Sequence, residues 1–485
     1  MIKQRSKTEK GGKDMLFSSV EFLYYFLPIV IATYFIVPQK FKNLILLISS
    51  LFFYFWGEPV YTLLMFAMAL SGYLHGLLID KFKGTYKAKI ALISSIVVGI
   101  GGLGFFKYSN FFIENINNFF DSTMSTLALA LPIGISFYTF QILSYTIDLY
   151  RGKYEVQKNF IDFFTYVALF PQLIAGPIVR YSDIDNELKA RTHSFENFAY
   201  GVNRFIIGLS KKILIANVLG EFCNIVKSSA NVSVLFMWAY IIAYAIHIYF
   251  DFSGYSDMAI GLGKIFGFNF PENFNYPYIS KSITEFWRRW HMTLGSWFRD
   301  YVYIPLGGNR VSKLKWIRNI FVVWFLTGFW HGAGWNFIVW GLMFAVLLFF
   351  EKIFLLKFLE KIPKVISTIF SRIYVIFFIL ISWVIFDAST LAEAISRIEI
   401  MFGANNTPLI NADTIYYIRS YAGVIILGLI GCTPILKNLI LKIKLDENGK
   451  KIINILEPVM QVALLVLSTA YLIDGSFNPF LYFRF

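Results

Sequence analysis

Long apolar runs alternate with short polar connections along nearly the whole chain. A helix needs about 20 mainly apolar residues to cross a hydrocarbon core, and runs of roughly that length recur from one end of the chain to the other. This recurrence excludes a secreted protein with one cleaved signal peptide, and it predicts an all-α polytopic membrane protein with about 11–13 membrane helices. The runs lie near 20–37, 43–56, 59–79, 88–106, 127–149, 160–179, 200–220, 232–252, 317–330, 334–355, 366–386, 413–432 and 453–473.

Basic residues concentrate in every second connection of the first third of the chain. Lys40 and Lys42 lie between the first two runs, and Arg151 follows the fifth. Because cytoplasmic loops carry an excess of Lys and Arg, this alternation places the basic loops in the cytoplasm and the start of the first helix outside. The five Lys and Arg residues of positions 1–14 conflict with that orientation. We therefore interpret 1–14 as a basic N-terminal extension that precedes a true start at Met15, or alternatively as a tail that is tolerated because it is short, and 15–485 as one integral membrane domain.

The segment 269–316 differs from its surroundings because it is polar, aromatic and basic at once. It is too charged to span the membrane and too aromatic for a solvated loop. Trp and Tyr favour headgroup depth, and long basic side chains reach out of the apolar zone. The pattern predicts an interfacial or re-entrant helix.

Composition agrees with a membrane protein. Hydrophobic residues make up 57% of the chain and charged residues 15%, whereas soluble domains are roughly half apolar and one quarter charged. The net charge of +14 could indicate nucleic-acid binding, but the Lys and Arg residues lie in short connections between apolar runs. Basic cytoplasmic loops are the simpler explanation, and we expect no nucleic-acid partner.

Two of the five histidines are candidates for chemistry. His331 in GFWHGAGWN and His291 in RRWH each follow a tryptophan at a polar interruption of an apolar region. An ionisable residue at membrane depth is a functional candidate, and a neutral imidazole can take a proton from a hydroxyl. The residues alone leave the alternative open that both are core histidines bonded to carbonyls. His75 and His193 fit structural roles, and His247 is less clear.

Other polar residues offer no site. Asp251 and Asp257 do not share one helical face, and we expect them to pair with arginines of the segment 269–316. Cys223 and Cys432 are far apart and have no Cys or His pattern beside them. This excludes a disulfide framework and a zinc cluster, and we expect no metal site.

Six stretches of the chain resemble the membrane-bound O-acyltransferases, most closely the bacterial branch that acts in alginate O-acetylation. The resemblance covers nearly the whole chain and is weakest from about 343 to 475. The stretches are MLFSSVEFLYYFLP (15–28), LPIGISFYTFQILSYTIDLYRG (131–152), FPQLIAGPIVRYSDI (170–184), YFDFSGYSDMAIGLGKIFGFNFPENF (249–274), SITEFWRRWHMTLGSWFRDYVYIPLGGNR (282–310) and GFWHGAGWNFIVWG (328–341).

This resemblance implies many helices around a central funnel or tunnel, where a cytoplasmic acyl donor meets an acceptor from the other side. It implies that His331 is the catalytic histidine and that His291 is the second polar position of the site. The ending FNPFLYFRF is similar to the tails of alginate-type relatives and of a small partner protein in teichoic acid D-alanylation. The similarity implies an acyl relay through Tyr482; an aromatic anchor at the membrane interface is the alternative.

The expected reaction is acyl transfer from a thioester, with acyl-CoA or an acyl carrier protein as donor substrate and no permanently bound cofactor. His331 acts as general base, and His291 positions a substrate or supports the oxyanion. Arg288, Arg289 and Arg299 suit the phosphates of such a donor, or alternatively anionic lipid headgroups.

The resemblance also implies a location in the bacterial cytoplasmic membrane and a separate extracytoplasmic partner of the esterase-like SGNH type. Alginate, another exported polysaccharide and peptidoglycan remain open as acceptors, as does teichoic acid D-alanylation, and the motifs favour acetyl over D-alanyl. A transporter of polysaccharide or lipid-linked sugars is the alternative from another class, because short glycine-interrupted helices suit it too.

Overall fold

The computed structural model describes residues 15–174, 176–404, 406–475 and 478–479, and these contain helices and no β-strand. The predicted all-α fold is confirmed. The chain divides into two compact units, Met1–Phe106 with Ala128–Thr192 and Lys107–Leu127 with His193–Phe485. A single domain over 15–485 stays a prediction.

The first unit contains helices from the N-terminal third of the chain. Its helices α3 and α5 pack closely where small residues face large ones: a Cβ atom on Gly76 would lie 2.7 Å from the ring of Tyr145. The elements are η2 (Phe22–Phe26), α1 (Leu27–Ile36), η3 (Gln39–Phe41), α2 (Lys42–Gly57), α3 (Pro59–Lys81), α4 (Tyr86–Phe120) as far as Phe106, α5 (Ile135–Tyr150), α6 (Phe160–Ala168), α7 (Phe170–Leu173) and α8 (Tyr181–Lys189).

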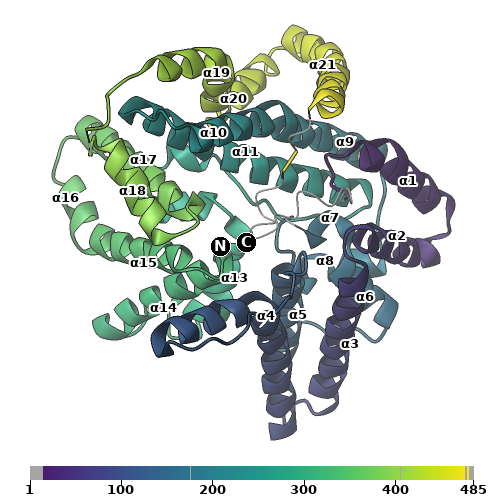
Figure 1. Ribbon diagram of the computed structural model, residues 1–485. Helices are drawn as coiled ribbons and strands as arrows, with labels where there is room; N and C mark the ends of the chain where they lie inside the picture. The colour runs from purple at the N-terminus through teal and green to yellow at the C-terminus, as the bar shows by residue number, and fades with distance from the viewer. Residues whose placement is uncertain (1–14, 175, 405, 476–477, 480–485) are drawn as a thin grey trace. The chain divides into compact units, whose positions relative to one another are not determined.

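The second unit is built around α11, which is buried along most of its length and lies beside α9 (Figure 1). The end of α4 also belongs to this unit. Its other elements are α9 (Phe195–Ser210), η4 (Lys211–Asn217), α10 (Val218–Ser228), α11 (Val234–Ile265), η5 (Pro277–Ile279), α12 (Ile283–Arg289), α13 (Met292–Phe298), η6 (Arg299–Tyr303), α14 (Lys313–His331), α15 (Trp335–Phe350), η7 (Glu351–Leu355), α16 (Leu356–Leu359), α17 (Lys364–Asp387), α18 (Leu391–Met401), α19 (Ala412–Gly431), α20 (Ile435–Ile443) and α21 (Glu447–Asp474).

Seven helical stretches in the described part of the chain are long and apolar enough to cross a membrane. The expected total of about 11–13 membrane helices stays a prediction for the shorter runs. The seven are Pro59–Lys81, Tyr86–Phe120, Val234–Ile265, Trp335–Leu359, Lys364–Asp387, Ala412–Gly431 and Glu447–Asp474.

Two predicted runs have different boundaries in the structure. The run 127–149 was wrong at its start, because helix α5 begins only at Ile135, after Gly134 with a φ of 75°. The run 160–179 was wrong as one helix. It breaks at Leu169, and the short helix α7 begins at Phe170 with Pro171 in its first turn. In both runs a residue with special backbone geometry ends an apolar pattern that would otherwise read as continuous.

The segment 269–316 contains the short pieces η5, α12, α13 and η6. At 1.5 Å per residue, a seven-residue helix such as α12 or α13 reaches only about 10 Å, so neither can cross a membrane. The placement of the segment as re-entrant or interfacial stays a prediction.

Candidate active site

The turn that carries His331 lies between two helices in backbone contact. Helix α14 ends at His331, and α15 begins at Trp335. A Cβ atom on Gly328 would collide with the carbonyl oxygen of Phe337, and one on Gly341 with that of Trp324. The glycines of this motif therefore allow the close crossing of α14 and α15 that fixes the position of the histidine.

Helix α4 supplies hydrogen-bond donors to the end of α14. Tyr108 donates to the carbonyl of Phe329 at 2.6 Å, and Lys107 Nζ donates to the carbonyl of Trp330 at 2.5 Å, with the carbonyl of His331 at 3.5 Å. The last four carbonyls of a helix have no partner inside it, and a cation is favourable there. This role of Lys107 was not predicted. The feature of the sequence that could have indicated it is the position of Lys107 as a lone lysine beside the apolar run 88–106.

The His331 imidazole is buried among aromatic rings. Its centroid lies 5.0 Å from the ring of Trp330, 5.1 Å from that of Trp340 and 5.3 Å from that of Phe386, and the latter two rings stand nearly perpendicular to it. Only 3% of the residue is exposed. Because burial disfavours a charged imidazole, the surroundings favour the neutral ring that a general base requires.

His291 is held by an asparagine from the preceding loop. Its backbone is left-handed, with a φ of 45°, a conformation that costs energy for a residue other than glycine. Asn273 Oδ1 lies 3.1 Å from His291 Nδ1 and accepts from the Thr293 hydroxyl at 2.9 Å. Since an amide oxygen only accepts, the hydrogen lies on Nδ1, and Nε2 is the basic nitrogen. The sequence analysis did not identify Asn273.

The structure brings His291 and His331 together. The Trp330 ring lies beside both imidazoles: its centroid is 6.1 Å from that of His291 and 5.0 Å from that of His331. The two imidazoles also lie within range of electrostatic interaction. Two motifs that are separate in the sequence thus lie together in the structure, and their catalytic roles stay a prediction.

A cavity of about 600 Å³ reaches this site. His291 lines it together with Thr327, which lies one helical turn before His331. Three exposed cations also line it: Arg288, Arg299 and Lys352. Lys352 was not predicted as a site residue. It lies near the end of the apolar run 334–355, where a lysine is ordinary.

The predicted arginines differ in their surroundings. Arg289 is not among the residues that line this cavity; it pairs with Glu285 at 2.9 Å and donates to the carbonyl of Asn275. Arg299 lines the cavity and pairs with Asp300 at 2.7 Å. The hydrogen bond to Asp300 raises the pKa of Arg299 above its usual value, so the guanidinium stays charged. Arg288 lies close enough to Lys352 for their charges to interact.

Helix α12, which carries Arg288 and Arg289, is fastened to η7 by Glu351. This carboxylate is fully buried and accepts from the backbone N–H of Ile283 at 2.6 Å and from the hydroxyl of Thr284 at 2.6 Å. A carboxylate at a helix N-terminus satisfies amides that have no partner in the helix. Glu351 therefore fixes α12 against the helix that provides Lys352.

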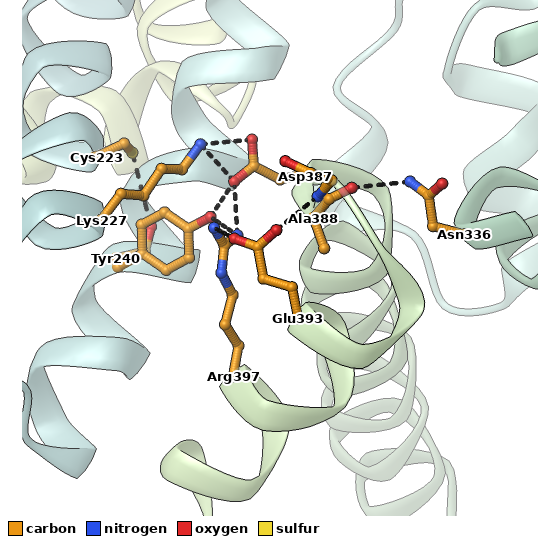
Figure 2. Close-up of polar contacts among 9 residues, drawn as sticks. Cys223, Lys227, Tyr240, Asn336, Asp387, Ala388, Glu393 and Arg397 are labelled. Carbon is orange, nitrogen blue, oxygen red and sulfur yellow. Dashed lines mark hydrogen bonds and ion pairs between the residues drawn. The ribbon is translucent and has the colours of Figure 1, made fainter. Parts of the chain in front are cut away.

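A cluster of charged side chains lies next to the His331 turn (Figure 2). Asp387 at the end of α17 pairs with Lys227 at 2.5 Å and with Arg397 at 3.0 Å, and it accepts from the Tyr240 hydroxyl. The neighbouring carbonyl of Ala388 accepts from Asn336 Nδ2 at 2.9 Å. This last bond ties the cluster to the first turn of α15.

The remaining predicted residues have the following places. Tyr482 lies outside the residues that the structure describes. Asp251 and Asp257 are paired, but the expectation of partners from 269–316 was wrong. Asp257 pairs with Arg204 at 2.7 Å and Lys211 at 2.6 Å, and Asp251 with Lys212 at 2.5 Å. The partners come from α9 and η4 because these elements pack along α11.

The chain is similar to known membrane acyltransferases. Residues 155–391 match the family model of the membrane-bound O-acyltransferases. A probable alginate O-acetylase of Pseudomonas aeruginosa is 43% identical over 80% of this chain and 75% of its own length. A peptidoglycan O-acetyltransferase of Helicobacter pylori is 36% identical over 81% of both chains. A teichoic acid D-alanyltransferase of Bacillus subtilis is 35% identical over 45% of this chain and 60% of its own length. With its apolar helices and this extent of identity, the chain belongs to the membrane-bound O-acyltransferase family and is a multi-pass membrane O-acyltransferase.

Proposed function

We propose that this chain takes an acetyl group from a cytoplasmic thioester donor and passes it across the bacterial cytoplasmic membrane for O-acetylation of an exported cell-surface polysaccharide. The observation that carries the proposal is a pair of buried histidines, of which His291 lines a cavity edged by cations. Relatives named as acetyl-transferring enzymes align with about four fifths of the chain, and the D-alanyl relative aligns with less than half. This difference favours acetyl.

The cavity suits the pantetheine arm of a donor. Binding sites for small molecules typically measure about 300–1,000 Å³, and this one joins exposed cations to the apolar rings of Trp287 and Trp324. Arg288 and Lys352 repel each other when no anion is present, so a donor phosphate between them relieves that repulsion. Coenzyme A and the phosphopantetheine of an acyl carrier protein share this phosphate, and either serves as donor.

The transfer step uses the two histidines differently. His331 removes the proton from the accepting hydroxyl while that oxygen attacks the thioester carbonyl carbon. The tetrahedral intermediate then breaks its C–S bond, the thiolate takes the proton from His331, and an ester remains on the acceptor. His291, with its hydrogen held on Nδ1 by Asn273, positions the reacting groups through Nε2. General-base catalysis of this kind contributes about 10²–10⁴-fold.

Tyr482 is the proposed first acceptor. Its phenolic oxygen would become the ester, and a separate SGNH-type partner on the outer face would then move the acetyl group to a polysaccharide hydroxyl. The tyrosine regains its proton in that second step, so the relay can run again.

Mass spectrometry of the cell-envelope polysaccharides tests the proposal. We expect O-acetyl groups in a strain with the gene and their loss, by about 10²-fold or more, when it carries His331→Ala. His75→Gln provides a matched control, because His75 forms its hydrogen bonds with Ser71 and Ser94 in the described part of the chain. Unchanged acetylation in a His331→Ala strain with normal protein levels would remove the catalytic assignment.

Peptidoglycan O-acetylation is a second candidate, since the Helicobacter pylori relative aligns over 81% of both chains. The same spectra separate the two functions, because muropeptides and exported polysaccharides are purified separately. A teichoic acid that loses D-alanine would instead indicate D-alanylation. A transporter of polysaccharide or lipid-linked sugars predicts that export, and not acylation, depends on this chain, and that His331→Ala has no effect.

A further inference from the structure

A second buried polar network lies where α9 continues into the π-helix η4. Lys212 and Asp251 are each only 1% exposed at their side chains, and Lys212 Nζ lies 2.5 Å from Asp251 Oδ1. Burying such a pair costs several kcal/mol of desolvation per ion before the attraction is counted. Short π-helical segments within α-helices are frequent at functional sites. The proposed reaction uses neither side chain, so the network needs another explanation.

Close helix packing builds this ion pair into the protein. A Cβ atom on Gly254 of α11 would lie 2.7 Å from the carbonyl oxygen of Gly208 on α9 and 3.2 Å from the backbone nitrogen of Lys212. A second glycine pair, Gly201 and Gly261, lies at the contact of the same two helices. A Cβ atom on either glycine would lie 2.6 Å from the carbonyl oxygen of the other. The close packing therefore fixes the position of Lys212 against α11, opposite Asp251.

The same ammonium group also binds the end of the chain. Lys212 Nζ donates to the carbonyl oxygen of Pro479, and Asn217 Nδ2 of the same π-helix donates to Asn478 Oδ1 at 3.1 Å. The chain leaves α21 at Asp474 and thus returns to η4 within five residues. Two successive residues of the C-terminal segment are held, one by its backbone carbonyl and one by its side chain.

The chemistry of these contacts fits an anchor. An ammonium has three N–H groups and no acceptor, so it can donate to a carboxylate and to a carbonyl together. Asp251 orients the ammonium, and hydrogen bonds from charged donors are roughly twice as strong as neutral ones. Asn217 adds a contact specific for a side chain of the tail.

We propose that Lys212, Asp251 and Asn217 form an internal docking site for the C-terminal segment of this chain, which fixes that segment at Asn478 and Pro479. The role in catalysis rests on the proposed relay through Tyr482. Three residues of chain span at most about 11 Å, so an anchor at Pro479 limits the volume that a group three residues further along can search. A smaller volume means a higher effective concentration at the site of transfer.

Chemical cross-linking tests the anchor without any assumption about catalysis. Cysteines replace the two contacting asparagines, Asn217→Cys and Asn478→Cys, in the full-length protein, and a short bifunctional thiol reagent joins them. The native Cys223 and Cys432 are buried and react slowly. We expect rapid cross-linking with the ion pair intact, and a rate about ten-fold or more lower when Lys212→Met and Asp251→Leu remove both charges together.

The paired substitution is chosen because Lys212→Met alone would leave Asp251 buried without its partner, whereas replacing a buried ion pair by apolar residues is often neutral for stability. Lys211→Met is the matched control, since Lys211 is the neighbouring lysine and pairs with Asp257 instead. Equal cross-linking rates in the protein with and without the charges would overturn the anchor. So would slow cross-linking in both.

Acyl transfer by the same variants separates the anchor from the relay. If the anchor serves the relay, the charge-free variant loses transfer by about ten-fold or more, and the cross-linker restores it by holding the tail in place. If cross-linking slows but transfer is unchanged, the anchor stands and the relay through Tyr482 is wrong.

Discussion

The His331 site and the Asp387 cluster both bury ionisable side chains, but they surround them in opposite ways. Asp387 is enclosed by Lys227, Arg397 and the Tyr240 hydroxyl (Figure 2). His331 lies among the rings of Trp330, Trp340 and Phe386. Charges that neutralise each other resist a change of protonation, whereas a neutral imidazole among aromatic rings can gain and lose a proton during a reaction. We infer that the first arrangement serves stability and the second serves chemistry.

The two regions are in contact: Asn336 in the first turn of α15 donates to the carbonyl of Ala388 beside Asp387, and the ring of Phe386 packs against that of His331. Their separate roles can therefore be distinguished only if stability and transfer are measured on the same variants. In the predictions below, acyl transfer is followed to a defined acceptor, and unfolding, where it is measured, is followed in detergent micelles.

The largest expected effect is on stability, from Asp387→Ala. The change leaves Lys227 and Arg397 close together without the carboxylate between them, and breaking a buried pair in this way costs about 3–5 kcal/mol of unfolding free energy. Thermal unfolding should show a clearly lower midpoint. Glu393→Gln is the control, because Glu393 is a more exposed partner of Arg397 and such pairs are worth about 0–1 kcal/mol. A normal midpoint with lost transfer would assign the cluster to the active site instead.

The next effect is on transfer, from Asn273→Ala. This change removes the acceptor for His291 Nδ1, for the Thr293 hydroxyl and for the Thr293 backbone N–H. A buried donor that loses its acceptor costs about 1–3 kcal/mol, so we expect transfer to fall by about 100-fold as His291 loses its orientation. Asn269→Ala in the same loop should have little effect, since Asn269 is exposed and accepts a hydrogen bond from Lys264. Equal losses in both variants would point to a general loosening of the loop.

The sequence predicts the helices better than it predicts their interruptions. Apolar periodicity and length identify α11, α17 and α21, because a helix in a membrane must satisfy its own backbone and leaves a long uniform signal. The break at Leu169 and the late start of α5 depend on one or two residues with special backbone geometry. A window of apolar residues averages over such positions.

The site shows a similar division. His331 and His291 could be predicted because each is a polar residue in an apolar region and lies in a motif of the family. Lys107, Asn273 and Lys352 could not, because their roles arise from contacts far along the chain. Lys107 meets the carbonyl of Trp330, which lies in a different helix. No local pattern records which helix ends will need a donor, so such residues become visible only when the helices are placed.

A moderate effect is expected from Lys107→Met, which removes the cation from the end of α14. A hydrogen bond to a charged group is worth about 1.5–3 kcal/mol, and relaxation of the turn should recover part of it, so we expect kcat to fall by about ten-fold. The KM for the donor should stay unchanged, because Lys107 is not among the residues that line the cavity. Lys107→Arg keeps the charge and should restore part of kcat. Loss of stability without any change in kcat would make Lys107 only a packing residue.

The smallest expected effect is on the KM for the donor, and it distinguishes the cations that line the cavity from the neighbouring Arg289. Lys352→Gln removes one exposed charge from the mouth of the cavity. A single solvent-exposed ionic contact is worth about 1 kcal/mol, so we expect the KM for the thioester donor to rise by about five-fold while kcat is unchanged. The rise in KM should become smaller when salt is added, since salt screens exposed charges. Arg289→Gln is the matched control: its guanidinium is held by Glu285 and the carbonyl of Asn275, so donor KM should not move. If Arg289→Gln instead raises KM as much as Lys352→Gln, the donor phosphate binds along α12 and not at the mouth that Lys352 shares with Arg288.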